Sequence, residues 1–232
     1  MISHSSLRTL RDEPRRKVHV VSTGFAAPTR ERCMVSVEGQ AGCEFEHHYI
    51  EASTQEPVRD VITNQMSAID GLDPHDVVVL LDGDDWLYTG SALAQVQAMH
   101  DVGAWVTYGS FVFADGRAAP EQFRQPYTEQ EWAKGPRSSV WRASHLKTLR
   151  AGLFQRLRRE DIIWPQGGGA WDQIAMFAAL EMAGPARSVY CPEILCAYNF
   201  ANSKEMRQGP EHDRQIDHAI RQRTPYRRIE KL

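Results

Sequence analysis

The sequence has few cysteines and no long apolar run. No stretch approaches the roughly 18–20 apolar residues that a membrane helix needs, so we expect no membrane span. The four cysteines, at positions 33, 43, 191 and 196, form no C-x-x-C pair and have no zinc-finger spacing. They therefore predict neither a zinc finger nor disulfides. The first 17 residues also lack an apolar segment, which argues against a secretory signal, so we expect a cytoplasmic protein.

No charge sign dominates either. The chain has 27 Lys and Arg against 30 Asp and Glu, a net charge of −3, which does not favour a nucleic-acid partner. A length of 232 residues, without repeats or low-complexity stretches, suits one domain. We expect a flexible leader over residues 1–16 and a single domain over residues 17–205. The remaining residues, 206–232, are expected to form a polar, partly helical tail packed on or near the active site.

Apolar runs alternate with amphipathic segments in the first half of the chain. Residues 77–81, VVVLL, are apolar at every position, which is typical of a central strand in a largely parallel sheet. Strands alternating with helices predict an α/β sandwich. The expected strands are 18–22, 45–50, 77–81, 105–108, 111–113 and 189–191, and the expected helices are 30–38, 57–70, 91–101, 144–156 and 172–182. A turn is expected at 115–116 and a glycine-rich loop at 165–169.

Three carboxylates, Asp82, Asp84 and Asp85, follow this central strand directly. In open α/β sheets, ligands bind at the carboxyl ends of the strands. Acids so close together repel unless a cation intervenes, and Mn²⁺ or Mg²⁺ accepts oxygen ligands. A divalent ion on a diphosphate stabilises the charge of a leaving group. The motif therefore predicts departure of a nucleoside diphosphate from a sugar.

Other interpretations of this motif stay open. Asp-Gly is a common turn, so the segment could be a hairpin tip with solvated acids. Haloacid-dehalogenase-like phosphatases also have D-x-D after an apolar strand, but Trp86 stands where they have Thr or Val. A metal-dependent nucleotidyl- or phosphotransferase would need a phosphate-binding glycine loop after the first strand, where only Gly24 is available. Gly-Asp-Asp, residues 83–85, also resembles polymerase palms, although this chain is short and acidic for that role. The last alternative is a non-catalytic nucleotide-sugar or glycan-binding module.

The segment LLDGDDWL, residues 80–87, resembles the D-x-D region of family-2-like GT-A glycosyltransferases. The resemblance extends over about residues 18–202, because further segments are similar to that family in the same order. These segments are VHVVST (18–23), SVEGQ (36–40), YIEAST (49–54), WVTYGSF (105–111), WRASHLKTLRAGLF (141–154), WDQIAMFAALEMAG (171–184) and YNFANS (198–203).

This resemblance implies a GT-A fold, a Rossmann-like nucleotide-binding α/β/α sandwich with a mixed, mainly parallel central sheet. It implies Asp84 as the main metal ligand, and Asp82 as a contact to the ribose or to the metal through water. Thr23 would lie near the nucleobase of the donor, and Glu51 would hold the nucleoside. Asp172 matches the acid at a helix start where inverting enzymes have a general base. The donor would be a UDP-sugar, and the acceptor a hydroxyl of a glycan, protein or small molecule.

Several further residues are weaker candidates. Glu160 and Asp161 compete with Asp172 for the role of base, although Arg158 and Arg159 just before them make a surface ion pair an alternative. Late histidines often complete the metal site in GT-A enzymes, and two tryptophans flank the glycine-rich loop where a sugar could stack. These candidates are His212, His218, Trp164 and Trp171.

Overall fold

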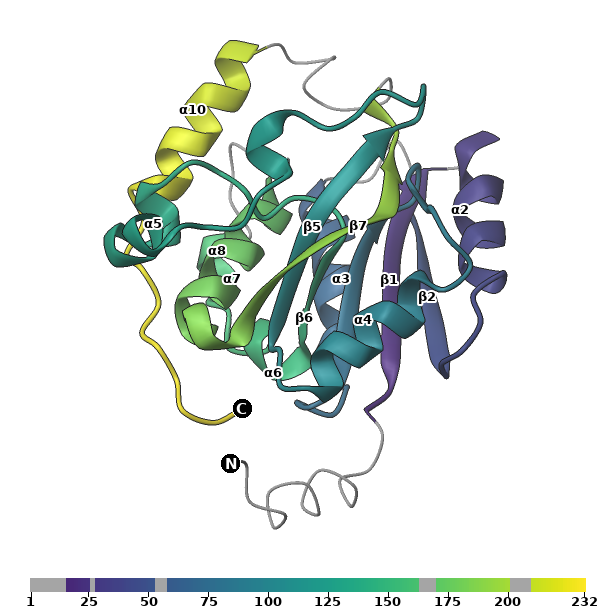
Figure 1. The fold of residues 1–232 in the computed structure, drawn as a ribbon, viewed down its shortest axis with the longest axis horizontal. Coiled ribbons are helices and arrows are strands. Elements are labelled where there is room, and N and C mark those ends of the chain that lie inside the picture. Colours follow the sequence, from purple (N-terminus) through teal and green to yellow (C-terminus); the bar gives the residue numbers. More distant parts are fainter. Residues whose placement is uncertain (1–15, 26–27, 53–57, 163–169, 201–209) are drawn as a thin grey trace.

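A computed structural model describes residues 16–25, 28–52, 58–162, 170–200 and 210–232. These residues form one seven-stranded sheet flanked by helices (Figure 1). The strands are β1 (Val18–Phe25), β2 (Phe45–Ala52), β3 (Val77–Asp82), β4 (Trp86–Leu87), β5 (Val106–Phe113), β6 (Lys147–Arg150) and β7 (Ser188–Tyr198). The expected loop at 165–169 lies outside the described residues.

The strand order in the sheet is β2-β1-β3-β6-β5-β7-β4. The longest ladders are parallel and join β1 to β2, β1 to β3 and β5 to β7. Strand β6 lies between the two parallel groups and pairs antiparallel with both β3 and β5. The predicted α/β class with a mixed, mainly parallel sheet is therefore confirmed.

Helices cover both faces of the sheet and define two cores. One core contains the apolar side chains of α3 (Val58–Asp70), α6 (Ala151–Phe154) and α8 (Trp171–Ala183). The other contains those of α2 (Pro28–Glu38) and α4 (Ala92–Asp101). Side chains of β3 alternate between the two cores, as they must in a strand with helices on both faces. The remaining helices are α5 (Glu129–Lys134), α7 (Arg159–Ile162) and α10 (Pro210–Arg221), with 3₁₀ turns at Glu121–Phe123, Pro136–Ser138 and Pro185–Arg187.

The second half of the chain departs from its predicted elements. The helix expected over 144–156 is wrong, because residues Lys147–Arg150 form β6 and only Ala151–Phe154 is helical. Pairing with two neighbouring strands satisfies the β6 backbone, and this tertiary context overrides local propensity. The two strands expected over 105–113 are one strand, β5, with a register shift against β7 between Gly109 and Phe111. Strand β7 extends well beyond the predicted 189–191.

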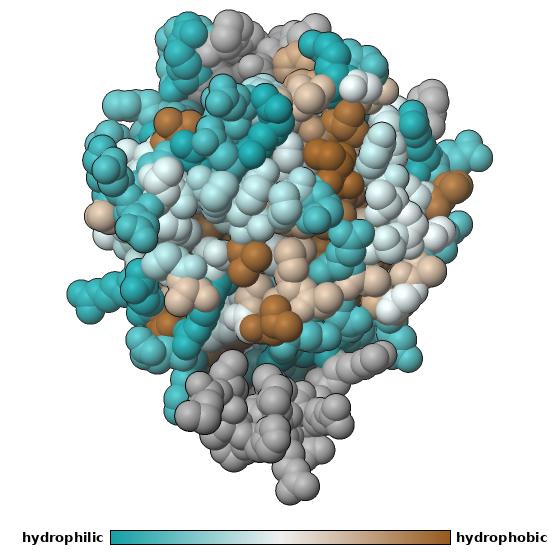
Figure 2. Space-filling model, viewed as in Figure 1, coloured by the Kyte–Doolittle hydropathy of each residue, from teal (hydrophilic) through white to brown (hydrophobic). Residues whose placement is uncertain are grey.

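Most of the face seen in Figure 2 is hydrophilic or intermediate, interrupted by a narrow hydrophobic band. None of the described helices has both the length and the apolar character to cross a membrane. Among the residues that the structure describes, the exposed large hydrophobic side chains lie on separate elements or loops: Val35, Tyr88, Val102 and Val140.

Candidate active site

The site begins where β1 and β3 end side by side. Thr23 pairs with Asp82 in the parallel ladder, and the Gly83 amide donates to the Thr23 carbonyl at 2.8 Å. A Cβ on Gly83 would lie 2.7 Å from the Gly24 Cα and 2.8 Å from the Thr23 oxygen, closer than real Cβ contacts. The middle residue of Asp-Gly-Asp must therefore be glycine for the backbone to turn here, with an acid on either side.

Asp85 is the most buried acid of the motif. Its side chain has no exposed surface, and its Oδ1 accepts a 2.8 Å hydrogen bond from the Asn199 amide at the end of β7. Its Oδ2 lies 3.3 Å from Nε2 of His145, and the same nitrogen lies 4.0 Å from Oδ2 of Asp82. One ligand atom from each of Asp82, Asp85 and His145 lies within 4.8 Å of the other two.

This group is electrostatically suited to a cation. Burial raises the pKa of Asp85 well above its usual range, and the charges of Asp82 and Asp84 raise it further. The Asn199 hydrogen bond only partly opposes this. A buried carboxyl in that position must either hold a proton or face a cation. Two carboxylates and one imidazole form a ligand set that Mn²⁺ accepts, so these residues fit a divalent ion.

A partly buried ion pair lies beside the three residues. Lys147 of β6 is 2% exposed, and its Nζ lies 2.6 Å from Oδ2 of Asp172 and 4.0 Å from Oδ2 of Asp82. Burial alone would lower the Lys147 pKa, but Asp172 and Asp82 outweigh it and the net pKa is raised. Burial alone would raise the Asp172 pKa, but Lys147 outweighs it and the net pKa is lowered. Lys147 and Asp172 are therefore both ionised at neutral pH.

His145 is held from three sides. Its ring stacks on Tyr198 with centroids 4.6 Å apart and meets Phe111 edge-on at 5.3 Å. Its Nδ1 lies 2.9 Å from the Ser144 hydroxyl, which leaves Nε2 to face Asp85. Burial, with the nearby charge of Lys147, lowers the His145 pKa well below its usual value. The ring is therefore neutral at pH 7, the form in which imidazole binds metals.

The residues predicted to hold the nucleotide lie along the same edge of the sheet. The Thr23 hydroxyl is buried and has no hydrogen-bond partner among the described residues. Glu51 of β2 pairs in register with Gly24, and its exposed carboxylate binds Arg30 of α2 at 2.9 Å. Asp84 is half-buried next to Asp85. The roles predicted for Thr23, Glu51, Asp82, Asp84 and Asp172 stay predictions.

The rival base Asp161 belongs to a different network. Its carboxylate accepts from Arg158 at 2.6 Å, from Arg223 at 3.2 Å and from the Tyr226 hydroxyl at 2.8 Å. These contacts tie α7 to the segment after α10 and give Asp161 a structural role. Of the other candidates, Trp171 packs edge-on against Phe154 at 6.2 Å, and His218 is exposed on α10. Trp164 and the His212 side chain lie outside the described residues.

Sequence reasoning did not assign roles to Asp85, His145 or Lys147. Asp85 stands inside the motif, directly after Asp84 and before Trp86, and this position is the one sequence signal that pointed to it. His145 and Lys147 lie in a segment similar to the GT-A family but predicted to be helical. Had this segment been predicted as an antiparallel central strand, His145 and Lys147 would have been expected beside the end of β3.

Comparison with known proteins gives matches to solved structures alone, since no family model and no curated protein matches the chain. Residues 1–349 of TarS from S. aureus in complex with UDP-GlcNAc match at 15% identity and a TM-score of 0.59, over 88% of this chain and 65% of that one. The complex with UDP matches at 17% identity and 0.57, over 88% and 64%. A longer TarS structure matches at 15% identity and 0.55, over 88% and 39%.

These matches identify the fold as GT-A, as the sequence predicted. At 15–17% identity, the likeness is one of fold. The chain also spans less than two thirds of the TarS chains that it matches.

Proposed function

We propose that this chain is a metal-dependent glycosyltransferase that moves a sugar from a UDP-sugar to an acceptor hydroxyl. The observation that carries the proposal is the convergence of three acidic and two basic side chains at one edge of a GT-A sheet. Asp82, Asp85 and His145 gather at the end of β3, and the Lys147–Asp172 pair lies against them. Ligands bind at this edge in open α/β sheets.

The acids after β3 would hold Mn²⁺ or Mg²⁺. Asp82 and Asp84 are the proposed ligands, and the closeness of Asp85 and His145 to Asp82 supports a cation between them. When bound, the ion neutralises charge on the departing diphosphate. The buried ammonium of Lys147 lies 4.0 Å from Oδ2 of Asp82, the oxygen that His145 also approaches, and adds positive potential toward an anionic donor.

Asp172 is the proposed general base. It lies in the first turn of α8, where the helix dipole and Lys147 both favour its ionised form. As the acceptor oxygen attacks the anomeric carbon, Asp172 takes the hydroxyl proton and UDP leaves with the bonding electrons. Because its pKa is low, Asp172 must act through position rather than through strong basicity. A single displacement of this kind inverts the anomeric centre.

The donor is proposed to be a UDP-sugar, with Thr23 near the base and Glu51 beside the nucleoside. The TarS structures of similar fold contain UDP and UDP-GlcNAc, which supports this nucleotide. The acceptor is a glycan, a protein or a small molecule in the cytoplasm. Residues 17–205 would form the catalytic domain and 206–232 a tail beside it. A hydrogen bond of 2.7 Å from Gln173 to Asp217 of α10 supports that placement of the tail.

The test is release of UDP from UDP-GlcNAc and related donors, with MnCl₂ or with a chelator, in wild type and in Asp84→Ala. We expect metal-dependent release in wild type and a loss of at least about 100-fold in the variant, since metal ligands supply several kcal/mol. The exposed Asp101→Ala is the matched control and should keep wild-type activity. Equal activity of Asp84→Ala and wild type would reject the assigned site, and UDP binding without turnover would favour the non-catalytic module.

A further inference from the structure

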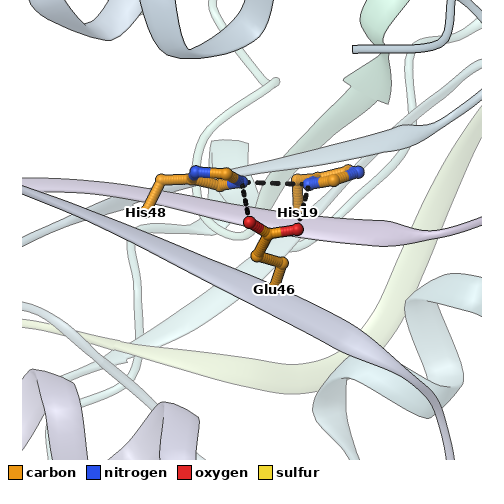
Figure 3. Close-up of side chains that lie close together, drawn as sticks. All are labelled: His19, Glu46 and His48. Atoms are coloured by element: carbon orange, nitrogen blue, oxygen red, sulfur yellow. Dashed lines mark hydrogen bonds and ion pairs between the residues drawn. The ribbon is translucent and has the colours of Figure 1, made fainter.

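A second cluster of potential metal ligands lies near the opposite end of the strands. His19 of β1 and Glu46 and His48 of β2 point toward one another (Figure 3). Nδ1 of His19 lies 3.0 Å from Nε2 of His48, and each of these nitrogens lies 3.9 Å from a Glu46 carboxylate oxygen. The glycosyltransferase reaction proposed above uses none of these side chains.

The strand register produces this convergence. His19 pairs with Glu46 in the parallel β1–β2 ladder, and Glu46 and His48 are two residues apart, so they share one face of β2. The exposed fractions of the side chains are 4% for His19, 48% for Glu46 and 23% for His48. The cluster therefore has a buried ligand at its base and an open side through which an ion can enter.

An acid behind His19 fixes the orientation of its ring. Nε2 of His19 lies 3.2 Å from Oδ2 of Asp76, just before β3, so Nε2 is the ring nitrogen placed to donate its N–H to that carboxylate. Nδ1 then presents its lone pair to the cluster. A carboxylate that accepts the second N–H of a histidine is the usual outer partner of a metal-bound imidazole.

We propose that His19, Glu46 and His48 bind a zinc ion, with His19 oriented by Asp76. Ligand atoms about 2.1 Å from a tetrahedral zinc lie about 3.4 Å from one another, and the separations of 3.0 and 3.9 Å bracket that value. Imidazole and carboxylate together suit zinc better than Mg²⁺. With the ion between the two rings, His48 carries its single ring proton on Nδ1, so that its Nε2 also presents a lone pair to the zinc. The fourth position is open to solvent.

Lys17 competes with the ion for the Glu46 carboxylate. Its Nζ binds Oε2 of Glu46 at 2.6 Å, and both side chains are about half exposed. Zinc binding must loosen this contact or use the other carboxylate oxygen. Removing the ammonium should therefore strengthen zinc binding, whereas a purely structural role of Lys17 predicts no effect on a metal.

The test is calorimetric titration of the chelator-treated full chain with ZnCl₂. Asp82→Asn is titrated in parallel, because the carboxylates and the imidazole at the Asp82 site also suit zinc. We expect one zinc per chain that Asp82→Asn retains, and a higher melting temperature on binding. His48→Gln and Glu46→Gln, which change partly exposed side chains, should each weaken binding by more than about tenfold, and Asp76→Asn by about 10–100-fold. Lys17→Gln should tighten it.

The matched control is His47→Gln. His47 neighbours the cluster in sequence but faces the other side of β2, where its Nε2 lies 3.1 Å from the Ser22 hydroxyl. This variant should keep wild-type zinc affinity. Circular dichroism melts with a chelator establish that each variant is folded. Either of two results overturns the proposal: no zinc binding by Asp82→Asn, or the same zinc affinity when a folded His48→Gln is compared with wild type.

Discussion

Strands β3 and β6 are neighbours in the sheet, and residues 77–81 of β3 are as buried as β6 but opposite in chemistry. Residues 77–81 of β3 are apolar, and their side chains alternate between the two cores. Strand β6 is buried at all four positions, yet three of them are polar: Lys147, Thr148 and Arg150. A central strand built this way carries a large desolvation cost, which only specific partners can offset.

Each polar side chain of β6 has such partners. Lys147 faces Asp172 and Asp82 at the candidate active site. Arg150, at the other end, donates to the carbonyls of His75, His100 and Ala104. Strand β3 thus contributes apolar side chains to the two cores. Strand β6 places a charged side chain at the candidate active site and, at its other end, a hydrogen-bond donor for backbone carbonyls. Buried polar residues in a central strand therefore indicate a specific role, either in a binding site or in hydrogen bonding to the backbone.

Replacing Arg150 with Met should give the largest effect, because it removes the polar contacts that distinguish this end of β6 from β3. Arg150 is 1% exposed, and its loss removes charge-assisted hydrogen bonds to three carbonyl oxygens. We expect the free energy of unfolding to fall by at least about 3 kcal/mol. Urea denaturation measures it, with Arg117→Met as the exposed control, which should change little. Equal midpoints for Arg150→Met and Arg117→Met would show that the contacts of β6 are dispensable.

Changing Gly83 to Ala tests the junction at the end of β3. The new Cβ would meet the backbone of Gly24 and Thr23, so one strand end must shift. We expect a loss of about 1–3 kcal/mol in unfolding free energy, together with weaker UDP binding. Gly71→Ala is the control, because a Cβ there meets nothing within 4 Å. If both variants melt at the same temperature, the close approach is not required.

Replacing Lys147 with Met should act mainly on the pH profile. Lys147 lowers the pKa of Asp172, so its removal raises that pKa. A general base must be ionised, and kcat/KM should therefore begin to fall at a higher pH on the acid side than in wild type. Exposed Lys134→Met is the control and should leave the profile in place. An unmoved acid limb in Lys147→Met would remove Asp172 from the role of base.

The same contrast explains what the sequence could predict. Strand β3 and its acids were predictable because an apolar run followed by D-x-D is a local pattern. The α/β class followed from the alternation of strands and helices in the first half. Strand β6 was not predictable from residues 144–156. These residues form a strand because they pair with β3 and β5, and both of those strands lie far from β6 in sequence.

The site was predictable to the same extent. Asp82 and Asp84 belong to a contiguous motif, and Asp172 stands at a recognisable helix start. The contacts of Lys147 with Asp82 and of His145 with Asp85 cross some sixty residues of chain, and no local period encodes them. Burial is also a tertiary property, so the exceptional environment of Asp85 could not be read from its neighbours.

The central claim is that the acids after β3 bind a nucleoside diphosphate through a divalent cation. Calorimetric titration of the wild-type chain with UDP, in MnCl₂ and in a chelator, tests it most directly. We expect one UDP per chain with Mn²⁺ and at least about tenfold weaker binding without it. UDP affinity that is the same in both conditions, or no binding in either, would contradict the claim.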